Sequence, residues 1–135
     1  MAASDYHGLV SALSEEQTQA VVAMAMDLAR QGRSEELKEF VQRGLPVNAQ
    51  DAEGNSLLML AAYRGQLETV RALIELGADV DLRNHRDQTP LAGALFKGED
   101  EIVRELRAAG ADLDAGTPTA RQAAEMFGRQ ALLEE

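Results

Sequence analysis

The sequence contains no cysteine and only two histidines, His7 and His85. Without cysteine the chain can form neither a disulfide nor a thiolate metal site, which is compatible with a reducing compartment. Two histidines so far apart in the chain give no zinc motif, and nothing places a nucleophile beside either of them in a Ser–His–Asp arrangement. The sequence therefore has no pattern typical of a zinc site or of a hydrolase triad.

Long apolar runs are also missing. No stretch approaches the roughly 18–20 apolar residues that a membrane-spanning helix needs. The start of the chain lacks a cationic segment followed by an apolar run, so no secretory signal is expected. A phosphate-binding Gly-x-x-x-x-Gly-Lys loop and the spacing of a calcium loop are absent as well. We expect a cytoplasmic protein that carries neither a cofactor nor a metal.

Basic residues are scarce, because 13 Lys and Arg stand against 23 Asp and Glu, for a net charge of −10. Affinity for nucleic acid comes largely from counterions that Lys and Arg release from the phosphates. Anionic membrane surfaces attract cationic segments in the same way. Neither nucleic acid nor a membrane is therefore expected as a partner. The simplest interpretation of the charge is solubility.

The chain does contain an internal repeat. Gly32, Gly65 and Gly98 are equally spaced, at a period of about 33 residues, which lies in the range of helical repeat units. The same spacing relates further glycine, acidic and apolar positions, among them Gly44, Gly77 and Gly110; Glu35, Glu68 and Glu101; Leu37, Val70 and Val103; and Phe40, Leu73 and Leu106. A fixed period over so many positions is the signature of stacked repeats, each of which buries its apolar face only against its neighbours.

Each unit is predicted to form two helices and a turn. Ser56 is placed to cap the start of a helix over 57–63. Gly65 can end that helix in the left-handed conformation, which costs glycine least. A second helix over 67–76 has apolar side chains at helical spacing. The next unit repeats this order, with Thr89 as the cap.

These units resemble ankyrin repeats. The strings NSLLMLAAYRGQLETVRALIELGADVD and DQTPLAGALFKGEDEIVRELRAAGADLD carry the T-P-L, A-A, G-x-x-E-x-V and G-A-D-V-D features of that family. The resemblance implies an all-α solenoid of about four stacked helix-turn-helix units, with atypical capping repeats at its ends. The single domain, 1–135, is expected to comprise an N-terminal cap (1–17), repeats at 18–50, 51–83 and 84–116, and a truncated capping repeat at 117–135.

The ends of the array are expected to differ from its middle, because a terminal unit lacks a neighbour on one side. Ser14 and Gln17 have the spacing of a capping box that opens a long helix. Thr119 can cap a helix in the last unit. Residues 1–13 are expected either to add a short helix around Leu9–Leu13 or to lack regular structure.

Four positions depart from the family pattern, and at one of them Leu57 replaces the usual proline. Met59 and Ala92 replace a histidine that the family usually has, so its hydrogen bonds between repeats are expected to be missing. Asp87 replaces the usual turn glycine, and Asp tolerates positive φ better than most residues. None of these departures conflicts with the expected fold.

The acidic residues are interpreted as structural. The pair Asp79 and Asp81 recurs one period later at Asp112 and Asp114, which indicates a role in forming turns. The acidic run at 99–101 stands at an expected helix start, where acids favour the helix dipole. Catalysis would need one asymmetric arrangement of groups, and none is visible. The chain is therefore not expected to be an enzyme.

The resemblance also implies where a partner binds, because ankyrin stacks usually meet partners with their turn tips and the exposed side of their first helices. Carried over position by position, these residues are Arg30, Gln50, Glu53, Asn55, Met59, Tyr63, Arg64, Arg83, His85, Arg86, Gln88, Phe96 and Lys97, with Ala52 and Ala92 among them. The set has five basic residues and one acidic residue, the reverse of the whole chain. Aromatic residues, Met and Arg are enriched at protein interfaces.

This composition predicts an adaptor or regulator that binds an acidic or amphipathic segment of another protein. Tyr63 and Phe96 can alternatively pack between repeats, and Arg83 and Arg86 can pair with nearby aspartates and only stiffen the turns. Those aspartates are Asp51, Asp81 and Asp87. A permanent subunit of a larger complex and an acidic mimic of nucleic acid are alternative functions. By itself the chain is expected to be a monomer.

Overall fold

The structure, a computed structural model, describes residues 13–135. Residues 1–12 lie outside this range, and most of the short helix expected at Leu9–Leu13 falls among them. The described helices are α2 Glu15–Gln31, α3 Ser34–Gln42, α4 Leu57–Tyr63, α5 Leu67–Glu75, α6 Pro90–Lys97, α7 Asp100–Ala108, α8 Ala120–Met126 and α9 Gln130–Glu134. Within 13–135 the β pairing consists of an isolated bridge between Gln50 and Ser56. The predicted all-α repeat fold is confirmed.

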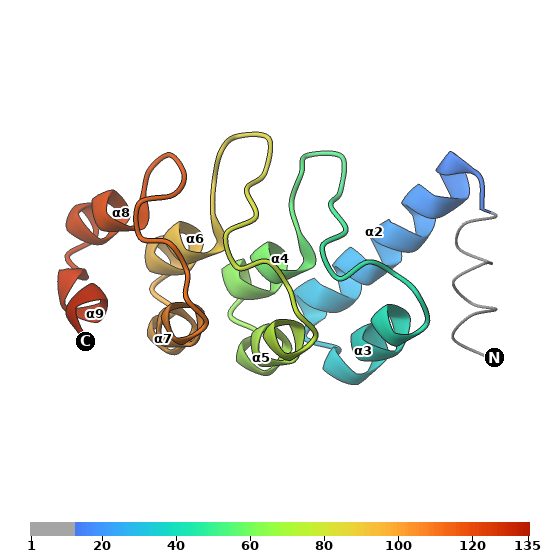
Figure 1. The fold of residues 1–135 in the computed structure, drawn as a ribbon, viewed down its shortest axis with the longest axis horizontal. Coiled ribbons are helices and arrows are strands. Elements are labelled where there is room, and N and C mark those ends of the chain that lie inside the picture. Colours follow the sequence, from blue (N-terminus) through green and yellow to red (C-terminus); the bar gives the residue numbers. More distant parts are fainter. Residues whose placement is uncertain (1–12) are drawn as a thin grey trace.

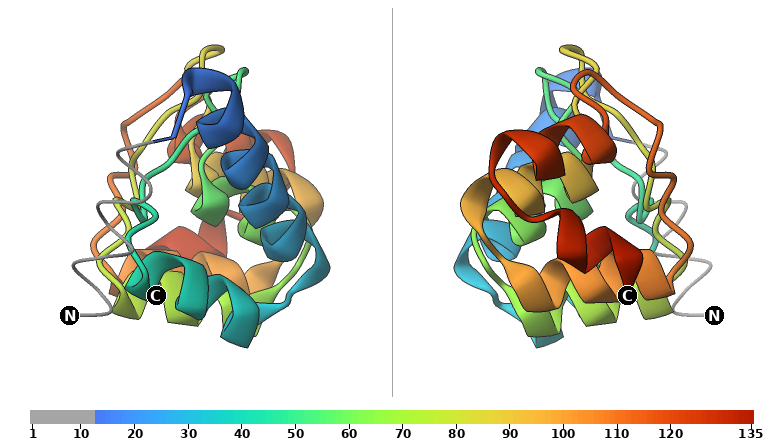
Figure 2. Two further views of the ribbon diagram at one scale, coloured as in Figure 1. Left: turned by 90° about the vertical axis from the view of Figure 1, so that its right-hand side faces the viewer. Right: turned by 90° about the vertical axis from the view of Figure 1, so that its left-hand side faces the viewer.

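The helices form two parallel layers (Figure 1). The first helix of each unit packs on the first helix of the next, in the order α2, α4, α6 and α8. The second helices α3, α5, α7 and α9 form the other layer in the same way. End-on views show the connecting loops on one side of the stack, rising from the second-helix layer to the first (Figure 2). Side chains of the first helices and the loop tips therefore share one surface.

The first helix of each unit starts with the side-chain cap that the sequence predicts. The Ser14 hydroxyl accepts from the Gln17 N–H at 3.0 Å while the Gln17 side chain accepts from the Ser14 N–H, which completes the capping box of α2. Thr119 opens α8 with a second capping box. Ser56 and Thr89 cap α4 and α6, which are one repeat apart. These hydroxyls satisfy backbone N–H groups that have no partner inside the helix.

The core lies between the two helix layers and between neighbouring units. Small side chains bring the first helices close together, and Ala61, Ala62 and Ala94 are fully buried. Larger apolar side chains of both layers, such as Leu73 and Leu95, fill the remaining space with at most 1% exposure. This continuous core holds the first helices in a row, and the row sets the geometry of the surface that they share.

Asx-type hydrogen bonds build the loop tips from the same position of two successive repeats. The Asp51 carboxylate accepts from the backbone N–H groups of Glu53 and Asn55, each at 2.9 Å. Asn84, one repeat later, accepts from the backbone N–H groups of Arg86 and Gln88 at 2.9 and 3.0 Å. Short polar side chains that satisfy their own backbone in this way favour a defined turn.

Hydrogen bonds also tie each loop to the next. The His85 N–H donates to the Glu53 carbonyl at 3.0 Å, and the Thr117 N–H donates to the Asp87 carbonyl at 2.8 Å. Asp87 has a φ of 61°, so this residue adopts the positive φ that it was expected to tolerate. The loop tips are therefore a connected edge of the stack, and their side chains project from a defined backbone.

Candidate protein-interaction surface

An open apolar groove of about 320 Å³ crosses the first helices α4, α6 and α8. We call it the first-helix groove. Its lining residues are Met59, Tyr63, Gln88, Ala92, Gly93, Phe96, Pro118, Ala123, Met126 and Phe127. Most of these side chains are apolar, with Gln88 and Pro118 contributed by two loops. A mostly apolar concave surface with a few polar groups at its edge is the usual form of a binding site.

Three aromatic rings from three successive units line up along this groove. Tyr63 and Phe96 stack with ring centroids 6.2 Å apart and 10° between their planes. Phe96 meets Phe127 edge to face, with centroids 5.3 Å apart. The Lys97 ammonium lies 5.0 Å from the centroid of the Tyr63 ring, within reach of a cation–π interaction. The rings therefore support one another across the units and hold a defined geometry.

The rings of the groove remain open to solvent despite these contacts. Tyr63 is 39% exposed, Phe96 56%, Phe127 40%, and the neighbouring Met126 66%. Tyr63 and Phe96 were expected either to be exposed to a partner or to pack between repeats. In the structure the two rings touch each other between repeats and are still exposed. Met59 and Ala92 are only 7% exposed and form the floor of the groove. The prediction that Met59 contacts a partner therefore concerns a mostly buried side chain in the groove floor.

The cations assigned to the surface differ in their pairing. Arg83 donates to the Asp87 carboxylate at 2.9 Å. This is the pairing with a nearby aspartate that was one of the two alternatives for Arg83. Arg30 donates to Asp27 at 2.8 Å. Within residues 13–135 the side chains of Arg64 and Arg86 make neither a hydrogen bond nor an ion pair, so both charges point into solvent.

Several predicted surface residues maintain the loops. The Gln50 amide donates to the carbonyls of Gly54 and Arg83 at 2.7 and 3.1 Å and so joins two loops. The Asn84 amide donates both to Asn55 at 2.9 Å and to Gln88 at 2.7 Å. These hydrogen bonds hold the loops at the edge of the surface in place. The amide groups that make them are therefore not free to bond to another molecule.

The Asp87 carboxylate also joins two neighbouring loops, through contacts with Thr117 and Arg83. The Thr117 hydroxyl donates to its carboxylate at 2.7 Å, and Arg83 donates to its other oxygen. The Thr117 hydrogen bond first, and then the Arg83 guanidinium, hold the pKa of Asp87 below its ordinary value of 3.8. The charged form of Asp87 therefore stabilises the loop edge.

The prediction from sequence missed the C-terminal part of the groove. Met126, Phe127, Ala123 and Pro118 line it, yet the predicted set ended at Lys97. A signal was present, because Gly128 falls three positions short of one full period after Gly98. Applying this shortened spacing to Phe96 leads to Met126. The first-helix groove therefore extends one unit farther than the predicted site.

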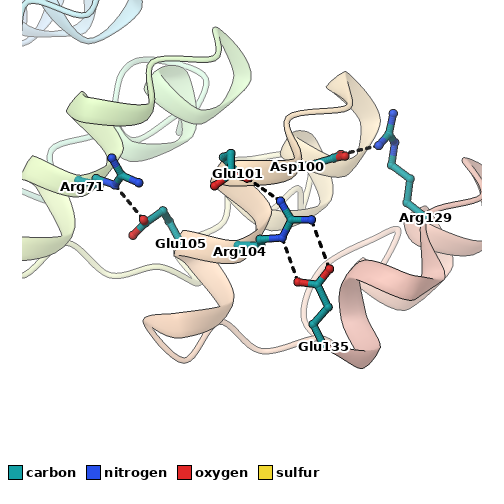
Figure 3. Close-up of polar contacts among 7 residues, drawn as sticks. All are labelled: Arg71, Asp100, Glu101, Arg104, Glu105, Arg129 and Glu135. Carbon is teal, nitrogen blue, oxygen red and sulfur yellow. Dashed lines mark hydrogen bonds and ion pairs between the residues drawn. The ribbon is translucent and has the colours of Figure 1, made fainter.

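The second-helix layer carries a set of ion pairs (Figure 3). Arg71 of α5 donates to Glu105 of α7 at 2.8 Å. Arg104 of α7 donates to Glu101 at 2.6 Å and to both carboxylate oxygens of Glu135 at 2.9 and 3.3 Å. Glu105 raises the pKa of Arg71, Glu135 raises that of Arg104, and Arg104 lowers the pKa of Glu135.

The chemistry of the remaining described surface is limited. No group of three or more His, Asp or Glu side chains among residues 13–135 is arranged to hold a metal ion. No helix in the same range is long and apolar enough to cross a membrane.

The comparison with protein families agrees with this architecture. A family model described as ankyrin repeats, three copies, matches residues 25–117. The chain belongs to the ankyrin repeat family. Ankyrin repeats are generally protein–protein interaction modules, and the family is typically non-enzymatic.

One curated relative supports the same family. A protein of Pseudomonas aeruginosa PAO1, described as an ankyrin repeat protein, is 51% identical to this chain over 47 residues. The match covers 35% of this chain and 28% of the relative. The chain thus spans less than a third of the length of this ankyrin protein, and the likeness concerns the repeats alone.

Proposed function

We propose that this ankyrin repeat protein is a non-enzymatic adaptor or regulator that binds another protein through the first-helix groove and the adjacent loop tips. The observation that carries this proposal is the location of the exposed apolar side chains. Five large hydrophobic side chains are exposed among residues 13–135, and the groove contains four of them: Tyr63, Phe96, Met126 and Phe127. Exposed apolar side chains gathered in one place indicate an interaction site.

The alternatives receive less support from the surface. A permanent subunit usually buries a large, mostly apolar interface, whereas this groove exposes four large apolar side chains and lies next to Arg64, which has no partner among residues 13–135. A nucleic-acid mimic needs a row of unneutralised acids. In and beside the second-helix layer, four acids are paired with Arg71 and Arg104: Glu68, Glu101, Glu105 and the C-terminal Glu135.

Capture of partners on the immobilised protein tests the proposal. The groove variant combines Tyr63→Ala, Phe96→Ala and Arg86→Glu. A matched control combines Met24→Ala with Arg33→Glu, because Met24 is 55% exposed on α2 outside the groove and Arg33 precedes α3, where an acid favours the helix dipole. Both variants change exposed side chains and the same amount of charge, and circular dichroism checks their helicity.

A protein that wild type and control capture from native lysate, and that the groove variant loses, supports the proposed function. Equal capture by all three proteins would move the site away from the groove. Gel filtration of the native lysate adds a second criterion. A permanent subunit would elute only within a large complex, and an adaptor would also elute free.

A further inference from the structure

The residues at the C-terminal ends of the first helices change in character from one end of the stack to the other. The C-terminal ends of the four first helices form a row. Equivalent positions in this row are Arg30, Tyr63, Phe96 and, after the shortened last turn, Met126. The positions that follow them are Gln31, Arg64, Lys97 and Phe127. The row is polar and cationic at α2 and wholly apolar at α8.

Exposure reinforces this gradient at its apolar end. Met126 and Phe96 are the two most exposed apolar side chains of the groove, at 66% and 56%. Ala92, Gly93 and Ala123 line the same groove and leave room beside its larger side chains. A bulky apolar group could therefore contact the exposed Phe96 ring, the Met126 thioether and the groove floor together. Burial of such a group is favourable in proportion to the apolar area that it removes from water.

The opposite end offers charge. The Arg64 side chain has no partner among residues 13–135, and Arg30 has one exposed aspartate neighbour on its own helix. Lys97 lies above the Tyr63 ring, so its ammonium group stands beside the middle of the row. Cations at helix C-termini complement the helix dipole, which accounts for their presence but not for the apolar side chains next to them. In a chain with a net charge of −10, this local cationic row favours acidic groups.

We propose that the first-helix groove binds a short protein segment in one orientation, with a bulky apolar side chain between Phe96 and Met126 and acidic side chains directed toward Arg64 and Arg30. The apolar anchor supplies most of the affinity, because aromatic contacts in a desolvated centre carry most of the binding energy at interfaces. The acidic residues set the direction, because a reversed segment would bring its carboxylates to Met126 and Phe127 and leave Arg64 unpaired. This inference rests on the proposed function and specifies the ligand of the same site.

Selection from a random peptide display library on the immobilised protein tests the composition of the ligand. We expect enriched peptides that carry one bulky apolar residue and a cluster of Asp or Glu on one side of it. Affinity of the consensus peptide should fall at least about tenfold on Phe96→Ala or Met126→Ala. Arg64→Glu should weaken it too, and this effect should shrink at high salt. Met24→Ala is the control and should leave the affinity unchanged.

Photo-crosslinking tests the orientation. The consensus peptide carries benzoylphenylalanine at its apolar position, and the crosslinked protein is digested with trypsin. Cleavage at arginine and lysine separates Phe96, in 87–97, and Met126, in 122–129, from Tyr63, in 44–64. We expect crosslinks on 87–97 and 122–129. A crosslink confined to 44–64, or selected peptides without acidic residues, would overturn this inference while leaving groove binding intact.

Failure of the proposed function gives a different result. Peptides whose affinity is the same for wild type and the Phe96→Ala variant would bind outside the groove and overturn both proposals. A library that yields no binder, together with partner capture that depends on the groove, would overturn only the short-segment inference.

Discussion

Tyr63 and Phe96 stack with nearly parallel rings, 6.2 Å between ring centroids, although a whole repeat separates them in the chain. Each ring occupies the same position of its own unit, so the stacking of the units brings the rings into register. The pair therefore depends on the packing between repeats and also forms part of the exposed first-helix groove.

Phe96→Ala should lower stability only modestly. The ring is 56% exposed, and its two aromatic contacts contribute about 0.5–1.5 kcal/mol each at most. Leu95→Ala, at the fully buried neighbouring position, should cost roughly 2–5 kcal/mol. Urea denaturation of the two variants measures both free energies of unfolding. Equal losses would mean that Phe96 belongs to the core and would weaken its assignment to the interaction surface.

Gly54→Ala should destabilise the loops more than Gly77→Ala. Both glycines have positive φ, at 82° and 93°, where a side chain costs roughly 1–2 kcal/mol. A Cβ atom at position 54 would also lie 2.6 Å from Cδ2 of His85 and 2.8 Å from its backbone nitrogen, whereas one at position 77 would meet nothing within 4 Å. The difference between their thermal midpoints measures how closely two loops approach. No difference would show that the loops separate easily.

Ser34 and Thr69 should be coupled in a double-mutant cycle. Their hydroxyl oxygens lie 2.6 Å apart between α3 and α5, and Thr69 is 1% exposed. Ser34→Ala and Thr69→Val should each lower stability, since either change leaves a hydroxyl without its partner. The double variant should lose less than the sum, with a coupling of about 0.5–1.5 kcal/mol. Additive losses would mean that the hydroxyl pair contributes nothing of its own.

Asp87→Asn should lower stability in a pH-dependent way. Because the folded pKa of Asp87 lies below 3.8, its ionised form contributes stability that is fully present above this value and is lost as pH falls through the folded pKa. Asparagine also tolerates positive φ, so the variant chiefly removes charge. Thermal midpoints should therefore differ near neutral pH and converge in strong acid. A difference that persists unchanged in acid would assign the loss to geometry instead.

The periodicity predicted the parts of the fold that repeat. Ser56 and Thr89 cap helices and Gly65 ends one because these roles depend on local backbone chemistry that the residues themselves specify. The sequence also placed Tyr63 and Phe96 at equivalent positions. Whether the rings would be covered was open, because exposure depends on neighbouring units rather than on spacing.

The rest of the site depends on a break in the period. The turn before α8 is shorter than its counterparts, since Gly128 falls three positions short of one full period after Gly98. A strictly constant period therefore misaligns the last unit, and Phe127 was not expected beside Phe96. The choice of Asp87 as the partner of Arg83 was equally open, because several aspartates lie near it in sequence and only the folded loop selects one.

Because each unit packs against the next, equivalent positions recur along the stack at intervals of one repeat. If the groove binds a segment as proposed, the number of units between the two capped ends sets the length of segment that it can contact. An extra copy of residues 51–83 would add one repeat and leave both ends as they are. Arg30 would then stand one repeat farther from the apolar end, whereas a copy of Arg64 would keep the place next to Phe96. In the proposed binding mode, the distance between the apolar residue of a ligand and an acidic residue that reaches Arg30 is therefore set by the number of repeats.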